Sequence, residues 1–262
     1  MRGFLSFLLD CLIPRSCLAC GRGIGSFDPV AVSSATRMTP RMEEFLDSGL
    51  RTELFAGISV SADVLCPGCW SKLELARGEG RLAGRSAGAM DVPLVSPFHT
   101  SDELLALVRF LKFSGGRSVV PPLGWWMAAA LGDYLGKAAE RDSFDCVLVP
   151  VPLHPTREKS RGYNQAALLA REVAGRLGLD VDSRILKRTR NTKAQSTLDR
   201  KKRSENVCGA FGLGRGEYAA GKNVILMDDL VTTGETAQAC IAALESASPR
   251  SIAVLAAGRA RD

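Results

Sequence analysis

Short, continuous apolar runs alternate with amphipathic stretches over the last two thirds of this 262-residue chain. Such runs are typical of strands that are buried on both faces of a parallel sheet. We expect strands at residues 92–98, 145–151, 224–227 and 252–257, the last of them closing the sheet. We expect helices at residues 102–113, 121–135, 163–177 and 235–244. This alternation predicts an α/β fold in which a parallel sheet carries helices on both faces.

Two of the predicted helices have positions that should face the core. The helix at 102–113 carries an apolar stripe made of Leu104, Leu105, Val108 and Leu111. Gly115 and Gly116 follow this helix and should end it. In the helix at 121–135, we expect Trp125 and Trp126 to pack in the core or between domains rather than to stack on a ligand.

Polar residues follow the strand at 224–227 abruptly, within the segment 223–237 (NVILMDDLVTTGETA). Two acids, Asp228 and Asp229, stand at the carboxyl end of this strand, which is where parallel sheets bind ligands. A loop of small and hydroxyl residues and the start of a helix come next, so backbone N–H groups should converge on an anion. The alternative is an ordinary strand-to-helix turn with a capping Thr, but a cap does not require two acids and TTG-x-T.

A basic segment takes the corresponding place after the strand at 145–151. Its sequence is PVPLHPTREKSRGYNQA, residues 150–166. If the two strands are neighbours, then Arg157, Lys159 and Arg161 should lie beside the two acids, because both strands end at the same edge of the sheet. A solvated basic loop is the alternative interpretation.

The acids and the loop resemble the phosphoribosyl pyrophosphate (PRPP) motif of the type I phosphoribosyltransferases. The resemblance implies that Asp228 and Asp229 contact the ribose 2- and 3-hydroxyls. It implies that the 5-phosphate is wrapped by Leu230, Val231, Thr232, Thr233, Gly234, Glu235 and Thr236. PRPP would bind together with Mg²⁺, and its pyrophosphate would meet the catalytic cations Arg157, Lys159 and Arg161.

Residues 187–206 have neither an apolar period nor a buried face, so they predict a long exposed loop. The stretch 184–203 holds nine basic residues and one acid; the whole chain has a net charge of +6, so the remainder sums to −2. In the phosphoribosyltransferase fold a mobile loop in this place closes over PRPP. The resemblance assigns this flexible loop to Lys193, Gln195, Arg200 and Arg203. The same charges could instead bind nucleic-acid phosphates.

Four of the eight cysteines form two C-x-x-C pairs, Cys17 with Cys20 and Cys66 with Cys69. Each pair can hold half of a tetrahedral zinc site, so together they predict a four-cysteine zinc ribbon with structural Zn²⁺. The 45 residues between the pairs exceed the ~15–20 of a compact site, so residues 26–60 are interpreted as an insertion. Redox-active pairs are the alternative, but neither pair has a strand-then-helix, thioredoxin-like context. The other cysteines, Cys11, Cys146, Cys208 and Cys240, are expected to be plain buried residues.

A Gly-, Arg- and Ala-rich stretch at 77–90 divides the chain into a zinc-ribbon module, residues 1–80, and a second domain, residues 81–262. Eight cysteines without a convincing export signal favour reduced thiols and a cytoplasmic location. The apolar stretch at 1–13 is too short for a transmembrane segment, which takes ~20 apolar residues. Its helical face at Phe4, Leu8 and Leu12 should pack on the protein, and peripheral contact with the inner membrane is left open.

Five features in fixed order resemble the ComF family of competence proteins. They are the zinc knuckles, RFLKFSGG (109–116), VPVPLHPTREKSRGYNQA (149–166), the Arg-rich loop with Gln195 and Leu198, and the PRPP motif. Family members combine a zinc ribbon with a type I phosphoribosyltransferase-like domain. The resemblance implies PRPP binding and the handling of single-stranded DNA in natural transformation, with a competence helicase as a partner. The alternative is an active phosphoribosyltransferase, unrelated to DNA, that moves phosphoribosyl from PRPP to an amine or nucleobase.

Overall fold

The computed structural model describes residues 16–24, 64–76, 78–82, 92–113, 116–139, 145–190 and 209–261. Several predictions from the sequence lie outside these residues. They concern the helical face at 4–12, the insertion at 26–60, Cys11, Cys208 and most of the basic run, residues 191–206. No helix in the described part of the chain is long and apolar enough to cross a membrane.

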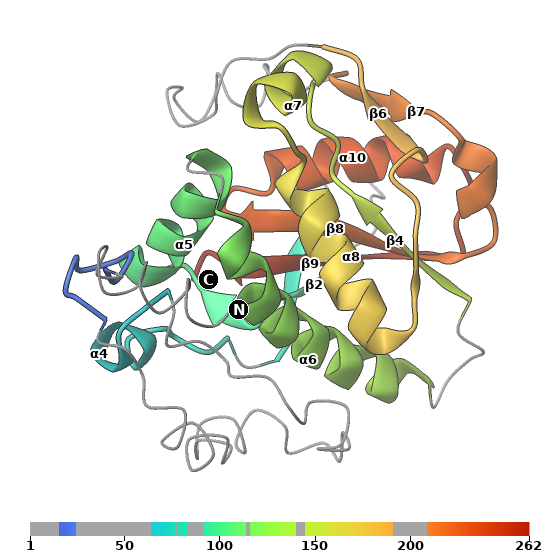
Figure 1. Cartoon of the computed structure of the whole chain (residues 1–262). Coiled ribbons are helices and arrows are strands. Elements are labelled where there is room, and N and C mark those ends of the chain that lie inside the picture. Colours follow the sequence, from blue (N-terminus) through green and yellow to red (C-terminus); the bar gives the residue numbers. More distant parts are fainter. Residues whose placement is uncertain are drawn as a thin grey trace, which may run out of the picture.

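The described residues form one seven-stranded sheet with the order β1-β2-β9-β8-β4-β5, and β3 also pairs with β9 (Figure 1). Its strands are β1 (Gly80–Leu82), β2 (Val92–Val95), β3 (Phe98–His99), β4 (Cys146–Pro150), β5 (Asp180–Val181), β8 (Asn223–Val231) and β9 (Ser251–Arg259). All pairings are parallel except that of β1 with β2. A separate antiparallel pair joins β6 (Leu186–Arg188) to β7 (Phe211–Leu213).

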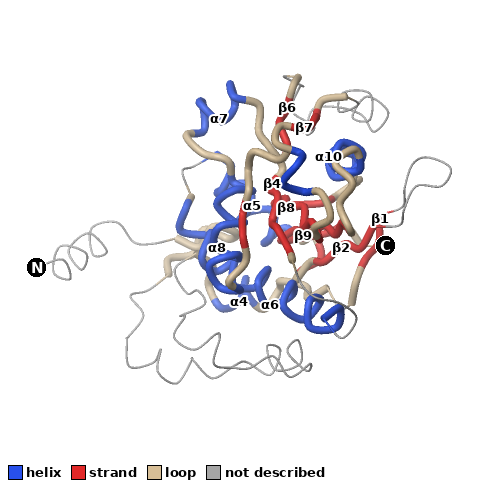
Figure 2. The backbone as a smooth tube through the Cα atoms, turned by 90° about the vertical axis from the view of Figure 1, so that its right-hand side faces the viewer, coloured by secondary structure: helices blue, strands red, loops and turns tan. Residues whose placement is uncertain are grey.

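Helices lie on both faces of this sheet, as the sequence predicts (Figure 2). The α-helices of the described residues are α4 (Pro67–Trp70), α5 (Asp102–Phe113), α6 (Val120–Ala139), α7 (Pro155–Arg161), α8 (Gln165–Leu177) and α10 (Glu235–Glu245). The same part of the chain holds the short 3-10 helices η2 (Arg117–Val119) and η4 (Gly216–Ala219). The mixed α/β fold with a mostly parallel sheet is therefore confirmed.

Two hydrophobic clusters follow from the alternation of side chains along β8. Ile225 and Met227 belong to the cluster that contains α5, α6 and α8, whereas Val224 and Leu226 belong to the cluster that contains α10. Successive side chains of a strand point to opposite faces of a sheet, so each cluster takes every second residue. Trp125 is 1% exposed and lies in the first cluster, as expected.

Three details of the predicted elements are wrong. β9 does not close the sheet, because it pairs with β2 on one side and with β8 on the other; every residue of β9 after Ser251 is buried, as suits a central strand. The strand expected at 92–98 is interrupted at Ser96, whose hydroxyl donates to the carbonyl of Phe98 (2.7 Å). In α5 the buried position is Leu107 rather than Leu105.

The segment 64–76 packs directly on the helices α5 and α6. Val64, Leu65 and Leu73 belong to the same buried cluster as α5 and α6. Backbone hydrogen bonds tie its end to β3, since the N–H of His99 donates to the carbonyl of Glu74 (2.8 Å). The four-cysteine segment and the sheet therefore share one core.

Candidate functional site

The carboxyl ends of β4 and β8 meet at one edge of the sheet. The two strands are parallel neighbours, with Val149 opposite Leu226 and Pro150 opposite Met227. The condition stated for the basic segment is therefore met, because the strands at 145–151 and 224–227 are neighbours. As a result, the segment that leads into α7 and the acids of β8 occupy the same edge.

The acids lie within β8 rather than beyond its end. β8 continues to Val231, and Leu230 and Val231 pair with Gly258 and Arg259 of β9. The sequence predicted that Leu230 and Val231 begin the phosphate-binding loop, but they are the last two residues of β8. β8 stays paired to its end because β9 has the same length, and residues of β9 pair with it as far as Arg259.

The turn between β8 and α10 is short and requires a glycine. Gly234 has φ = 77°, in the left-handed region, and directly precedes α10. A Cβ at this position would lie 2.8 Å from Cδ2 of Leu82. One small pocket is lined by Asp228, Leu230, Val231, Thr232, Thr233, Gly234, Glu235, Thr236 and Ala237. All seven residues predicted to wrap a phosphate thus line a common pocket at the start of a helix, where backbone N–H groups favour anions.

The two acids have different surroundings. Asp229 is 2% exposed, and its Oδ1 lies 2.8 Å from Nζ of Lys112 on α5; its Oδ2 is buried and has no hydrogen-bond partner among the described residues. Asp228 lines the pocket, and its Oδ1 accepts a hydrogen bond from the backbone N–H of Asp229 (2.8 Å). Asp228 thus lines the pocket, whereas Asp229 is held by Lys112 of α5.

Burial and neighbouring charges shift the pKa values of Asp228 and Lys112. Burial and the neighbouring charge of Asp229 raise the pKa of Asp228 to about 7. Burial would lower the pKa of Lys112, but the charge and hydrogen bond of Asp229 raise it above its ordinary value. Lys112 was not predicted as a site residue, although it stands in the RFLKFSGG segment that the sequence singles out.

The predicted basic loop contains the short helix α7. Pro155 stands in its first turn, and Gly162 ends it with φ = 82°. Burial lowers the pKa of Arg161, as does the like charge of Arg157, whereas the charge of Asp229 opposes this lowering in part. Lys159 is exposed on α7. The structure therefore brings Arg161 to the acids and leaves Lys159 facing solvent.

A further cation comes from β6. Arg188 was predicted to belong to an exposed loop, but it is a strand residue with its guanidinium 5.1 Å from the ring centre of Phe211. Burial lowers its pKa, as does the charge of Arg157, whereas Asp228 opposes both. The strand forms because β7 supplies a partner, which the local sequence does not reveal. The predicted loop residues Lys193, Gln195, Arg200 and Arg203 lie outside the described residues.

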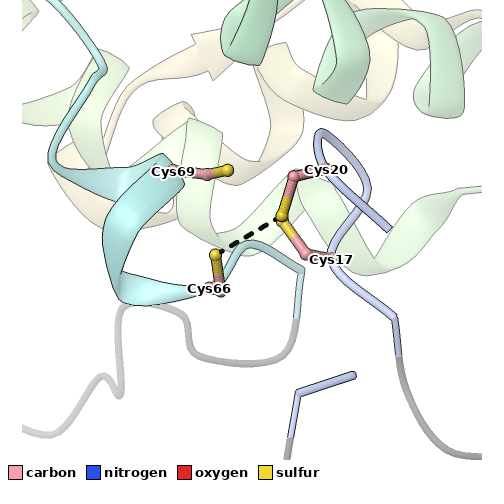
Figure 3. Close-up of side chains that lie close together, drawn as sticks. All are labelled: Cys17, Cys20, Cys66 and Cys69. Atoms are coloured by element: carbon pink, nitrogen blue, oxygen red, sulfur yellow. Dashed lines mark hydrogen bonds between the residues drawn. The ribbon is translucent and has the colours of Figure 1, made fainter. Parts of the chain in front are cut away.

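The four cysteines converge, although they come from two segments far apart in the chain (Figure 3). The sulfurs of Cys17, Cys20, Cys66 and Cys69 all lie within 4.8 Å of one another. Sγ of Cys20 is 3.7 Å from Sγ of Cys66. A tetrahedral zinc site with Zn–S bonds of about 2.3 Å has S···S edges of roughly 3.8 Å, so the cluster fits zinc.

The thiols also differ in proton affinity. Burial alone would raise the pKa of Cys17, but backbone hydrogen bonds from Cys66, Cys20 and Ala19 lower it to about 6. Burial raises the pKa of Cys69 to about 12, and hydrogen bonds with the other thiols act in the same direction. One thiolate is thus favoured before any metal binds, and a bound cation would stabilise the remaining thiolates. Cys146 and Cys240 are buried away from this cluster, as predicted.

Three curated relatives align with parts of this chain. Competence protein F of Haemophilus influenzae (strain ATCC 51907 / DSM 11121 / KW20 / Rd) is 31% identical over 140 residues, which are 53% of this chain and 60% of that protein. Competence protein ComFC of Bacillus subtilis (strain 168) is 41% identical over 90 residues, or 34% of each chain. DNA utilization protein YhgH of Escherichia coli (strain K12) is 37% identical over 89 residues, 34% of this chain and 38% of that protein.

The chain thus spans 60% or less of the length of these relatives. No protein-family model matches it. The crystal structure of TT1426 from Thermus thermophilus aligns with 55% of this chain and 84% of that chain, at 17% identity and a TM-score of 0.32. The resemblance to ComF competence proteins that the motifs predict is confirmed by the named relatives.

Proposed function

We propose that this ComF-type protein binds PRPP with Mg²⁺ at the edge formed by β4 and β8, and that it takes part in handling single-stranded DNA during natural transformation. The observation that carries PRPP binding is the pocket shared by Asp228 and the turn into α10. In this pocket the carboxyl group of Asp228 lies next to the turn that would bind a phosphate, and a sugar phosphate needs both an acceptor for its hydroxyls and donors for its phosphate. The names of the relatives, which refer to competence and DNA utilization, support the link to DNA.

The pocket suggests how a ribose 5-phosphate would bind. Thr232, Thr233 and Gly234 and the first turn of α10 would donate hydrogen bonds to the phosphate, and the helix end adds a favourable field. Carboxylates accept from hydroxyls, so Asp228 and Asp229 would hold the ribose ring. The left-handed turn at Gly234 brings the backbone close to the ligand.

The diphosphate of PRPP needs cations beside the ribose. Arg161 and Arg188 approach the acids from α7 and β6, and their charges interact with Asp229 and Asp228 respectively. Mg²⁺ would arrive with the diphosphate, because it binds substrate phosphates and keeps several waters. Together these groups would neutralise a leaving pyrophosphate.

Part of the basic run is already engaged in the fold. Arg184 forms hydrogen bonds with both carboxylate oxygens of Asp182 (3.0 Å each), and Arg188 faces the acid edge. A DNA strand would therefore be attracted mainly by the remainder of the run, residues 190–203. This attraction would be electrostatic and without base preference.

An active phosphoribosyltransferase is the second candidate. It is favoured by one specific arrangement, in which the acid pair, the turn pocket and the cations Arg161 and Arg188 all occupy one edge of the sheet. A protein that had lost PRPP chemistry would have no need for this complete set. The candidate differs from the first in requiring an acceptor and turnover.

The proposed zinc is structural. Cys17, Cys20, Cys66 and Cys69 would close all four coordination positions and fix residues 16–24 on the segment 64–76. A closed site leaves no position for a substrate. Zinc would thus stabilise the fold without taking part in chemistry on PRPP.

Binding is tested by thermal unfolding with PRPP and MgCl₂. At ~100 times its dissociation constant, a ligand that binds the folded state adds roughly 2.7 kcal/mol of stability. The variant Asp228→Asn, Asp229→Asn keeps the side-chain size but weakens the acceptors, so it should lose the ligand-induced shift. Asp133→Asn, at an exposed ion pair on α6, is the control and should keep it. Wild-type protein that gains no stability from PRPP would contradict the proposal.

Turnover separates the two candidates. Pyrophosphate release from PRPP is measured with a panel of nucleobases and amines. Release that depends on an acceptor and disappears in the double Asn variant would establish the transferase. Binding without release would favour the role in DNA handling.

A further inference from the structure

The ion pair between Lys112 and Asp229 links the end of α5 to the acid edge of β8. Nζ of Lys112 lies 2.8 Å from Oδ1 of Asp229, and the two side chains are 27% and 3% exposed. The pair Lys137–Asp133 on α6 has a similar distance, 2.7 Å, but its side chains are 61% and 25% exposed. The two pairs have nearly the same length and very different burial, so they need different explanations.

Lys112 is held in place by its surroundings. It follows Leu111, whose carbonyl accepts a hydrogen bond from the hydroxyl of Tyr163 (2.6 Å), and Leu111 itself is fully buried. The guanidinium of Arg117 lies 5.1 Å from the ring centre of Tyr163. The last turn of α5 is thereby fixed to the start of α8, so Lys112 is a cation in a defined place rather than a mobile surface side chain.

The contact determines which oxygens of the acid pair remain for a ligand. Oδ1 of Asp229 is occupied by Lys112, and Oδ1 of Asp228 is occupied by the backbone N–H of Asp229. Oδ2 of Asp229 is buried and has no hydrogen-bond partner among the described residues. A buried carboxylate oxygen without a donor is costly, and a sugar hydroxyl would supply the donor.

Stability alone does not account for the pair. Removing two charges from water costs free energy that a buried ion pair often fails to recover, and apolar replacements can be equally stable. A second function at this position explains why two charges are placed there.

We propose that Lys112 is a positioning residue that fixes the carboxylate of Asp229, so that its free oxygen is directed to the sugar hydroxyls. The proposal rests on the proposed function and deepens it, because it makes the RFLKFSGG segment part of the PRPP site. Lys112 acts through Asp229 and does not itself contact the ligand.

A double-mutant cycle tests this claim. The dissociation constant of PRPP with Mg²⁺ is measured by calorimetry for wild type, Lys112→Met, Asp229→Asn and the double variant. Lys112→Met should weaken binding at least ~10-fold in the wild-type background and less than ~2-fold in the Asp229→Asn background, because contacting residues are coupled. Equal losses in both backgrounds would mean that Lys112 binds the ligand directly, and would overturn the proposal.

Two further variants separate positioning from folding. Lys112→Arg keeps a cation that can reach Oδ1 and should recover part of the affinity, whereas Lys112→Gln should not. Lys137→Met, which removes the exposed pair, is the matched control and should leave binding unchanged. If Lys112→Arg and Lys112→Gln bind equally well, the charge has no positioning role.

A measurement without ligand keeps the test independent of the proposed function. The ¹³C chemical shift of the Asp229 carboxyl is compared between wild type and Lys112→Gln at one pH. A clear shift, with the rest of the spectrum preserved, is expected; an unchanged shift would refute positioning even in a protein that binds PRPP. If wild type fails to bind PRPP but the Asp229 signal still differs between wild type and Lys112→Gln, the proposed function is disproved. The positioning of Asp229 by Lys112 is then still supported.

Discussion

The four-cysteine cluster and the acid edge of β8 are built in different ways. Among the described residues around the cysteines, the secondary structure consists of the four-residue helix α4 and the isolated bridges Ser16–Gly23 and Leu75–Phe98. The acids stand on a nine-residue strand with parallel partners on both sides. The first site has little secondary structure of its own and depends on its four cysteines and on packing against α5 and α6, whereas the second takes its shape from the sheet. Changes at the first should therefore disturb folding, and changes at the second should mainly disturb binding.

The largest expected effect comes from the variant Cys66→Ser, Cys69→Ser. It should lose the single zinc and several kcal/mol of stability; structural zinc contributes on the order of 10 kcal/mol in isolated zinc peptides. The loss is smaller here because Leu65 and Leu73 still pack in the same core as α5 and α6. Elemental analysis and thermal unfolding provide the measurement. Cys146→Ala should keep its zinc, and a double Ser variant with full zinc content would refute the assigned ligands.

The variant Gly234→Ala should show a smaller effect on stability together with a loss of PRPP binding. An Ala with φ = 77° costs roughly 1–2 kcal/mol, and its Cβ would also press on Leu82. Gly178→Ala provides the control, because Gly178 has φ = 67° and no atom within 4 Å of the added Cβ. Both variants should lose stability in chemical denaturation, but only Gly234→Ala should lose the stabilisation by PRPP. Equal behaviour would show that the turn does not hold the phosphate.

The pH dependence of stability should reveal the burial of Asp228. Its pKa is raised from 3.8 to about 7 by burial and by the charge of Asp229. The folded protein therefore retains this proton better than the unfolded chain, so the contribution is full below pH ~4 and is lost as the pH rises to about 7. Asp228→Asn removes this loss, and its melting temperature relative to wild type should increase from pH 5 to pH 8.

An acid with the opposite shift provides the control. The pKa of Asp182 is lowered, chiefly by its side-chain hydrogen bond with Arg184. Its contribution is present at neutral pH and is lost on acidification, so Asp182→Asn should differ from wild type at pH 7 and converge with it in acid. A pH-independent difference for Asp228→Asn would show that this carboxyl is already ionised in the folded protein.

The smallest expected effect is weak binding of single-stranded DNA through the basic run. If ~4 phosphates are neutralised, the log-log salt slope should be about −3. Changing Arg200, Lys201, Lys202 and Arg203 to Ala should bring the slope closer to zero. The control removes the same charge elsewhere, at the exposed residues Lys72, Lys137, Arg171 and Arg250. Titrations across a salt series decide the matter, and equal slopes for both variants would exclude the run as the DNA site.

Local sequence was sufficient for those parts of the site that one segment provides. Asp228, the turn and α10 are consecutive, and the apolar run, the two acids that follow it and the resemblance of the loop to the PRPP motif singled them out. The four cysteines were also predictable, because the spacing within each C-x-x-C pair indicates a common metal. Their convergence confirms that two knuckles can be paired from sequence even across a long separation.

The parts that failed depend on partners distant in the chain. Nothing near Lys112 indicates that it meets Asp229, and nothing near Arg188 indicates that β7 converts its segment into a strand. The central position of β9 in the sheet likewise depends on its pairing with β2 (Val92–Val95), which is far from β9 in the sequence. Periodicity reports which face of an element is buried, but it does not report which element covers that face.

One helix joins the two contrasted regions, and its length has a consequence. Glu103, in the first turn of α5, lies 3.8 Å from Lys72 of the cysteine segment, and Lys112 stands in the last turn. The 12 residues of α5 span about 18 Å, so the helix sets the spacing between the cysteine cluster and the acid edge of β8. It also sets a rotational phase, since one added or deleted residue would turn Lys112 by roughly 100° about the helix axis. The helix itself could tolerate such a change, but the ammonium group of Lys112 would then point away from Asp229.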